Sequence, residues 1–176
     1  MGGNRSREQE EDREPDPESV ARAILLRQLT LGPRSRHQLA GKLRERNVPE
    51  ETAEMVLERF EEVGLIDDGA FAAMWVRSRS ESKSLSKSAL RRELASKGIG
   101  GQTAEDALAD LSDEDEDEAA RRLVERRVRP AVLGDRATKD RELRRLVGML
   151  ARKGHPPARA FRIASDVLEE ASRRSL

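Results

Sequence analysis

Apolar residues recur at helical spacing through most of the chain. Leu39 and Leu43 lie four residues apart, and apolar side chains at positions 53, 56, 57 and 60 continue the three-to-four-residue spacing. Such spacing places these side chains on one face of an α-helix. The pattern from Ser35 to Phe60 therefore predicts two short amphipathic helices.

This pattern occurs three times. The stretch from Ser35 aligns without gaps with the stretch from Ser86, at an offset of 51 residues, and a third copy follows 56 residues later. Three copies at nearly constant spacing indicate tandem structural repeats. Aligned apolar positions are Leu39 with Leu90 and Leu146, Leu43 with Leu94 and Leu150, and Val48 with Ile99.

A tight turn is predicted between the two helices of each copy. Asn47, Gly98 and Gly154 hold equivalent positions, and these residue types accept the left-handed backbone conformation that closes a helix. Proline favours the start of a helix. Prolines stand where the following helix would begin, at Pro49, Pro156 and Pro157.

A further apolar helix precedes each pair, which makes the unit a bundle of three helices. One such unit carries too little apolar surface to be stable alone, so neighbouring units must stack. We expect an all-α fold, an elongated array of three tandem three-helix repeats over residues 18–65, 66–112 and 113–176. Residues 1–17 are charged and interrupted by proline, and are expected to form a disordered acidic tail. The preceding helices are expected at Val20–Leu31, Phe71–Arg79 and Ala119–Arg129.

Composition restricts the protein class. Cysteine is absent, so neither a disulfide framework nor a thiolate site is available. Apolar runs fall short of the ~18 residues of a membrane span, and the N-terminus is too acidic for a signal peptide. We expect a cytoplasmic monomer that does not contact the membrane.

Charge is unevenly distributed although the net charge is zero. Residues 1–18 carry a net charge of −4, and residues 119–176 carry +9. A basic C-terminal part favours an acidic or polyanionic partner. The same charges are equally consistent with solvated helix faces.

The acid run Asp113–Glu118 is predicted to open a helix. Carboxylates are favourable at the positive end of the helix dipole, and arginines from Arg126 to Arg129 stand near its negative end. A calcium loop is excluded because Glu118 and Val124 stand where that loop requires Gly and Glu. The run is therefore interpreted as the junction before the third repeat.

The sequence contains no convincing catalytic or cofactor-binding motif. The stretch "KGIGGQT" from Lys97 lacks the Gly-Lys-Ser/Thr of a phosphate-binding loop and follows a predicted helix rather than a strand. His37 and His155, the two histidines, lack a ligand cluster or a nucleophile partner and are placed on turns or exposed faces. We expect no cofactor, no metal and no enzymatic activity.

The central region resembles the RecX regulatory proteins. That family's pattern combines an acidic pair, a Phe-Ala step, an aromatic-Val-Arg-x-Arg helix and a later "eL..KGi" helix. The resemblance implies an all-helical modulator that binds RecA and the groove of the RecA–DNA filament and inhibits its ATPase and strand exchange, in homologous recombination, DNA repair and the SOS response. The matching residues are Asp67, Asp68, Phe71, Ala72, Trp75, Val76, Arg77, Arg79, Glu93, Leu94, Lys97, Gly98 and Ile99.

The loop Ser80–Ser88 departs from the family pattern, because serines stand where glycines are common. Ser86 or Ser88 can cap the helix that follows. Trp75 is interpreted as a core residue, since a stacking surface for bases would need several aromatic side chains beside basic ones.

Basic residues are the candidate partner-binding residues. They could contact acidic RecA surfaces or DNA phosphates, or they could be paired locally with acids such as Glu125 and Glu142. Two other functions stay open: a RecA-independent nucleic-acid-binding protein and a helical adaptor. The candidates are Arg77, Arg79, Arg91, Arg92, Lys97, Arg122, Arg126, Arg141, Arg145 and Arg152.

Overall fold

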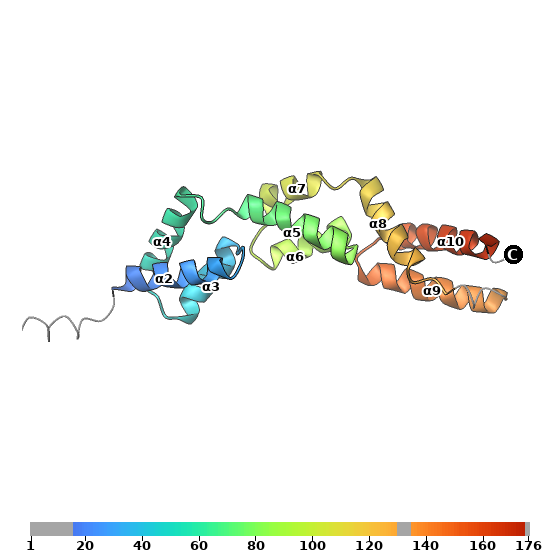
Figure 1. Ribbon diagram of the computed structural model, residues 1–176, viewed down its shortest axis with the longest axis horizontal. Helices are drawn as coiled ribbons and strands as arrows, with labels where there is room; N and C mark the ends of the chain where they lie inside the picture. Colours follow the sequence, from blue (N-terminus) through green and yellow to red (C-terminus); the bar gives the residue numbers. More distant parts are fainter. Residues whose placement is uncertain (1–15, 130–134, 175–176) are drawn as a thin grey trace, which may run out of the picture. The chain divides into compact units, whose positions relative to one another are not determined.

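The computed structural model describes residues 16–129 and 135–174, and all regular secondary structure among them is α-helical (Figure 1). The predicted all-α fold built from three-helix groups is confirmed. Most of the tail predicted for residues 1–17 lies outside the described residues, and Pro17 begins the first described helix. The helices are α2 (Pro17–Thr30), α3 (Arg36–Glu45), α4 (Glu50–Glu62), α5 (Asp68–Lys83), α6 (Lys87–Ala95), α7 (Gly101–Ala109), α8 (Asp113–Glu125), α9 (Arg136–Arg152) and α10 (Pro157–Arg174).

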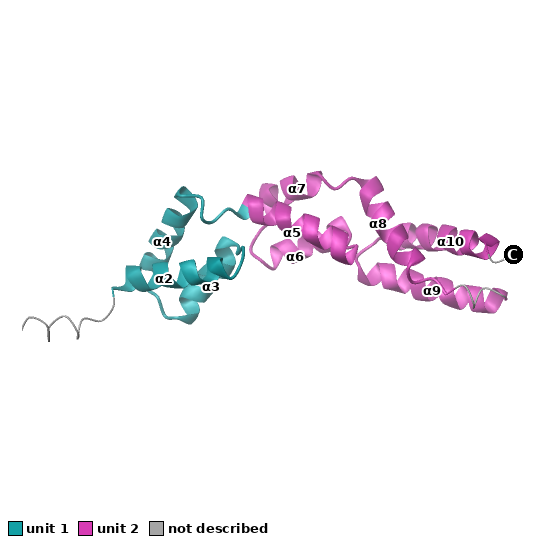
Figure 2. Ribbon diagram, in the orientation of Figure 1, with its two compact units in different colours: residues 1–68 teal, residues 69–176 magenta. Residues whose placement is uncertain are grey.

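The chain divides into two compact units, residues 1–68 and residues 69–176 (Figure 2). In the first unit, α2, α3 and α4 pack around an apolar core that includes Leu25, Leu39 and Leu57, all fully buried. The backbone N–H of Arg36 donates to Oδ1 of Asp68 at 2.8 Å. An acid further along the chain therefore satisfies a backbone N–H in the first turn of α3. The boundaries of the three predicted repeats stay a proposal.

The second unit holds two apolar clusters. Helices α5, α6 and α7 contribute the first, around Phe71, Leu90 and Leu94. Helices α8, α9 and α10 contribute the second, around Leu146 and Leu150. Burial of these Leu side chains stabilises each cluster by about 2 kcal/mol per side chain.

Left-handed residues end the second helix of each group, as predicted. The φ angles are 56° at Asn47, 75° at Gly98 and 88° at Gly154. The residue that follows each of them donates its N–H back to the last helical turn, for instance from Ile99 to the Leu94 carbonyl at 3.0 Å. This bond satisfies a carbonyl that the helix end would leave without a partner.

Side-chain caps fix the starts of several helices, whereas α4 and α7 begin without one. Ser86 caps α6 by accepting a hydrogen bond from the Ala89 N–H. A serine of the loop Ser80–Ser88 therefore caps the helix that follows, as predicted. Ser112 and Asp115 form a capping box at the start of α8. All six acids from Asp113 therefore lie within α8, which confirms that the acid run opens a helix.

Helix α9 begins earlier than its counterparts. The copies align Ser35 and Ser86, the cap residues of α3 and α6, with Glu142, which lies inside α9. Asp135 caps α9 instead, by accepting from Thr138 N–H at 2.9 Å. The third copy therefore carries more than one extra helical turn before the aligned position.

Candidate partner-binding surface

Trp75 on α5 is the centre of a group of stacked side chains. Its ring is half-buried, and the Phe71 ring stacks on it with centroids 5.8 Å apart. The Arg79 guanidinium carbon lies 4.5 Å from the Trp75 ring centroid, and Lys97 Nζ lies 4.0 Å from it. Two cations over one indole stabilise this arrangement through cation–π attraction.

Glu93 on α6 ties this group together. Trp75 Nε1–H donates to Glu93 Oε2 at 2.8 Å, and Arg79 Nε lies 3.2 Å from the same oxygen. Trp75 therefore packs against the core, as predicted, while its polar edge is satisfied by an acid. Arg79, Glu93 and Lys97, which match the family pattern, contact Trp75 and so help to pack α5 against α6. Their charge alone did not indicate this role.

Arg77 lies on the same helix with different surroundings. Its side chain is exposed and forms no ion pair with an acid in the described part of the chain. It borders a shallow groove of about 670 Å³. The other residues lining this groove are Ala70, Ala73, Met74, Ser78, Glu81 and Ser82.

Arg91 and Arg92 on α6 have local partners. Arg91 binds Glu105 on α7 with two hydrogen bonds, of 2.7 Å and 2.9 Å. The hydrogen bond from Arg91 lowers the pKa of the Glu105 carboxyl. Arg92 donates to Ser88 Oγ at 2.8 Å.

Two predicted residues of the basic C-terminal part are also paired. Arg122 lies 2.5 Å from Glu118, one turn earlier on α8. Arg145 donates to Glu142 at 2.6 Å and to the Arg127 carbonyl. The hydrogen bond from Arg145 lowers the pKa of the buried Glu142.

The remaining predicted cations of this part are exposed and form no ion pair among residues 16–129 and 135–174, although Arg141 interacts electrostatically with Asp135. Arg126 lies at the C-terminal end of α8. Arg141 and Arg152 lie three helical turns apart on α9, and this spacing places them on one side of the helix about 16 Å apart. Arg141 contacts Thr138 Oγ1 at 3.2 Å.

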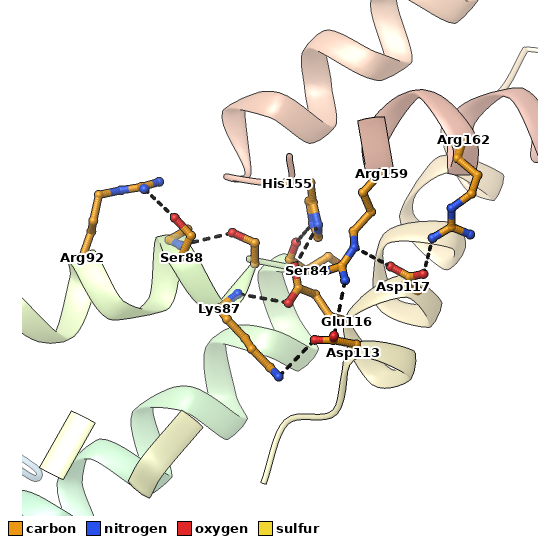
Figure 3. Close-up of polar contacts among 12 residues, drawn as sticks. Ser84, Lys87, Ser88, Arg92, Asp113, Glu116, Asp117, His155, Arg159 and Arg162 are labelled. Carbon is orange, nitrogen blue, oxygen red and sulfur yellow. Dashed lines mark hydrogen bonds and ion pairs between the residues drawn. The ribbon is translucent and has the colours of Figure 1, made fainter. Parts of the chain in front are cut away.

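A polar cluster joins α8 and α10 to the start of α6 (Figure 3). Arg159 Nη1 lies 2.9 Å from Glu116 Oε1, and Arg159 Nε lies 3.0 Å from Asp117 Oδ1. Lys87 contributes its backbone N–H to Glu116 at 3.4 Å and its Nζ to Asp113 at 3.2 Å. The acid run thus supplies side chains that connect two three-helix groups of the second unit.

His155 is part of this cluster, and it lies on a turn, which is one of the two predicted placements, but it is buried rather than exposed. It occupies the turn after Gly154, and its Nε2 lies 3.0 Å from the Ser84 carbonyl oxygen. One feature of the sequence could have predicted its burial, because the copies align His155 with the apolar residues Val48 and Ile99. A polar residue at an apolar repeat position indicates a buried polar contact.

The surroundings of Glu116 lower the pKa of its carboxyl although the side chain is buried. Burial by itself raises the pKa of this carboxyl, but the His155 ring, the Lys87 backbone N–H and Arg159 together lower it. Arg162 also contacts Asp117, so acids and bases alternate through the cluster. Glu116 and His155 are buried, whereas Asp113 and Arg162 are largely exposed, so only the inner part of this network is removed from water.

The described ranges contain neither of two further kinds of feature, a metal-binding cluster or a membrane-spanning helix. They contain no cluster of three or more His, Cys, Asp or Glu side chains placed to hold a metal ion. Among the same residues, no helix is both long and apolar enough to cross a membrane.

Comparison with known proteins identifies the family. Residues 21–60 match the model of the RecX first three-helix domain, and residues 67–108 match that of the second. The chain is 51% identical over 171 residues to the regulatory protein RecX of Streptomyces coelicolor, covering 96% of this chain and 89% of that relative. It is 45% identical to the regulatory protein RecX of Thermobifida fusca, covering 85% and 79%.

Solved structures agree on the fold. A crystal structure of RecX from Lactobacillus salivarius superposes with a TM-score of 0.74 at 22% identity, covering 91% of this chain and 99% of that one. A crystal structure titled regulatory protein RecX superposes with a TM-score of 0.72 at 28% identity, covering 86% and 74%. The relatives are named as regulatory proteins rather than as enzymes. Sequence identity over nearly the whole chain, the two domain matches and the shared helical fold together show that this chain belongs to the RecX family of regulatory proteins.

Proposed function

We propose that this protein binds RecA and the RecA–DNA filament and restrains the ATPase and strand-exchange activities of RecA. Membership of a regulatory family and the central family-like motif support this proposal. The observation that carries it is the contrast between Arg77 and the other motif cations. Arg79 and Lys97 are occupied by Trp75, whereas Arg77 is exposed beside a groove that contains Met74 and two alanines.

The groove beside Arg77 has the composition of a protein-binding surface. Met74 and two alanines line it together with two serines and Glu81, and Arg77 supplies a cation at its edge. Apolar contact area with an arginine anchor is typical of interface positions that contribute most to binding. An acidic side chain of the partner would pair with Arg77 while the partner's apolar side chains cover Met74.

The basic C-terminal part offers a second contact. Arg126, Arg141 and Arg152 remain available to an anion, and the pair on α9 presents two charges along one side of a helix. Phosphates or surface acids of a nucleoprotein filament are suitable partners for such a pair. Four candidates would have to break an ion pair within this chain before they could pair with a partner: Arg79, Arg91, Arg122 and Arg145.

The test is RecA's DNA-dependent ATP hydrolysis, measured with increasing amounts of the purified protein. We expect hydrolysis and strand exchange to slow as the protein approaches stoichiometry with RecA. Unchanged rates at a stoichiometric amount would refute the proposal.

A second candidate is RecA-independent binding to nucleic acid, favoured by the +9 charge of residues 119–176. Binding of this kind releases counterions and weakens steeply as salt concentration rises. Titration of fluorescent DNA without RecA at several salt concentrations distinguishes the two. Tight, strongly salt-dependent binding together with an unaffected RecA ATPase would favour this candidate over filament regulation.

A further inference from the structure

Helix α5 uses only one of its faces for packing within the α5–α7 group. Phe71, Ala72 and Val76 are buried in the apolar cluster of that group. The other side of the helix is open and lines two grooves, of about 670 Å³ and about 150 Å³. Ala73 and Arg77 line both grooves, so the grooves meet along this open face.

The open face follows helical spacing over three turns. Ala70, Ala73, Met74, Arg77 and Glu81 stand three or four residues apart along α5, which places their side chains on one side of the helix. Met74 is 39% exposed and is the large apolar side chain among them. Another helix can pack against a face with this spacing by placing its own side chains between those of α5.

The serines beside this face already have hydrogen-bond acceptors. Ser80 Oγ donates to the Arg77 carbonyl at 3.0 Å, and Ser82 Oγ donates to the Ser78 carbonyl at 2.7 Å. Because these hydroxyl protons are engaged within α5, the serines act as small side chains. Small side chains allow a second helix to approach to an interaxial distance of about 8–10 Å.

The charges that line the two grooves are one base and two acids. Arg77 and Glu81 lie one turn apart on α5, and Asp110 lines the smaller groove from the C-terminal end of α7. All three are exposed, and none of them forms an ion pair in the described part of the chain. An arginine one turn before a glutamate is the less favourable order for a pair within one helix. A polyanion such as DNA would meet two acids for each base here, which favours a protein partner.

We propose that the open face of α5 binds an α-helix of RecA, the partner in the proposed function on which this inference rests, and that this helix carries an acid and a base one turn apart. In the complex, the acid of the bound helix pairs with Arg77 and its base pairs with Glu81. Its apolar side chains cover Met74. Complementary charges of this kind fix the register of a bound helix and exclude partners with the wrong charges.

A peptide tests this surface without RecA. The probe is a synthetic alanine-rich helical peptide with leucines on one face and a glutamate and a lysine one turn apart. It is added at millimolar concentration to the full chain labelled with nitrogen-15. We expect the amide signals of Ala73, Arg77 and Glu81 to shift most, and a matched peptide with glutamine at both charged positions to bind about tenfold more weakly. Equal affinity for the two peptides, or no shift on α5, would overturn the proposal.

Charge reversal tests the same surface against RecA. The DNA-dependent ATP hydrolysis of RecA is measured with increasing amounts of the unmodified protein, Arg77→Glu and Glu81→Arg. Each reversal should raise the concentration for half-maximal inhibition about tenfold, because it places like charges opposite each other. Glu58→Arg is the control for the change in net charge and should inhibit as the unmodified protein does. Glu58 is exposed on α4 and forms no ion pair in the described ranges.

The direction of the Glu81→Arg effect distinguishes the possible partners. Stronger inhibition by Glu81→Arg would indicate a partner that is acidic alone, such as a nucleic acid, and would overturn the proposal. If the unmodified protein leaves RecA hydrolysis unchanged, the proposed function fails, and the peptide titration alone decides whether α5 binds a helix of this kind.

A second copy of this chain would also match the charges, since two antiparallel α5 helices would pair Arg77 with Glu81 twice. Light scattering measures the mass of the protein in solution. A dimer that Arg77→Glu breaks, and that the double variant Arg77→Glu with Glu81→Arg restores, would assign the open face to self-association and overturn the proposal. We expect the mass of a single chain for all three proteins.

Discussion

Arg77 and Arg79 lie two residues apart on α5 and serve different purposes. The Arg79 guanidinium covers the Trp75 ring and pairs with Glu93, whereas Arg77 is exposed and unpaired with any acid in the described ranges. Residues two apart on a helix do not share a face. The Arg-x-Arg pattern thus separates a structural cation from one that a partner can use.

Arg77→Ala is expected to weaken regulation of RecA without weakening the fold. Loss of one cation at an apolar interface should raise the concentration needed for half-maximal ATPase inhibition about tenfold, or about 1.4 kcal/mol. Arg59→Ala is the matched control, because Arg59 is exposed on α4 and pairs with Glu62. Equal inhibition by both variants would exclude Arg77 from the binding surface.

Arg79→Ala is expected to lower stability instead. It removes a cation from the Trp75 ring and the ion pair to Glu93, at a cost of about 1–2 kcal/mol. Trp75 is the single tryptophan, so its fluorescence during urea unfolding reports directly on this region. Arg77→Ala measured in the same way should stay within about 0.5 kcal/mol of the unmodified protein. A larger loss in Arg77→Ala than in Arg79→Ala would contradict these assignments.

Gly154→Ala is expected to destabilise the second unit by about 2–4 kcal/mol, because alanine resists the left-handed conformation and its Cβ would clash. That Cβ would lie 2.5 Å from Ser86 Oγ and 2.9 Å from Ala89 Cβ. Gly41 in the interior of α3 provides the contrast, since nothing lies within 4 Å of an added Cβ. Gly41→Ala should stabilise by about 0.5–1 kcal/mol. Thermal unfolding of both variants checks the pair.

Because of Glu142, the free energy of unfolding is expected to fall as the pH is lowered into the acid range. The hydrogen bond from Arg145 lowers its pKa in the folded state, below the unfolded value of about 4.3. The stabilisation is therefore present above about pH 4.3 and is lost as pH falls through the lowered folded value. Glu142→Gln should be less stable than the unmodified protein at pH 7, and the difference should shrink toward pH 2. Urea unfolding across this range measures it, with Glu45→Gln at an exposed pair with Lys42 as control. A difference that is constant with pH would exclude this role.

The helical groups and their turns could be predicted because they depend on local sequence. Asn47, Gly98 and Gly154 adopt the left-handed conformations that their alignment predicted, and the Leu positions that align are buried. The early start of α9 was harder to predict, because the aligned cap position holds Glu142 and the residues before it are polar. Helix ends depend on which cap forms, and Asp135 competes effectively for that role.

The polar contacts of the candidate surface could be predicted only in part. The hypothesis of local pairing named Glu142, which does pair with Arg145, but Arg91 pairs with Glu105 across two helices. Such a pair depends on how α6 and α7 pack, which spacing along one helix does not reveal. The burial of Glu116 likewise depends on His155, which lies far along the chain.

The start of α9 removes a contact that the first two copies share. In the second unit, the Lys87 amide at the start of α6 is satisfied by Glu116 of the following group, and in the first unit the Arg36 amide is satisfied by Asp68. The aligned amide of the third copy belongs to Leu143, which lies inside α9 and bonds within that helix. The third copy therefore lacks the bond by which an acid further along the chain satisfies the start of the second helix in the first two copies.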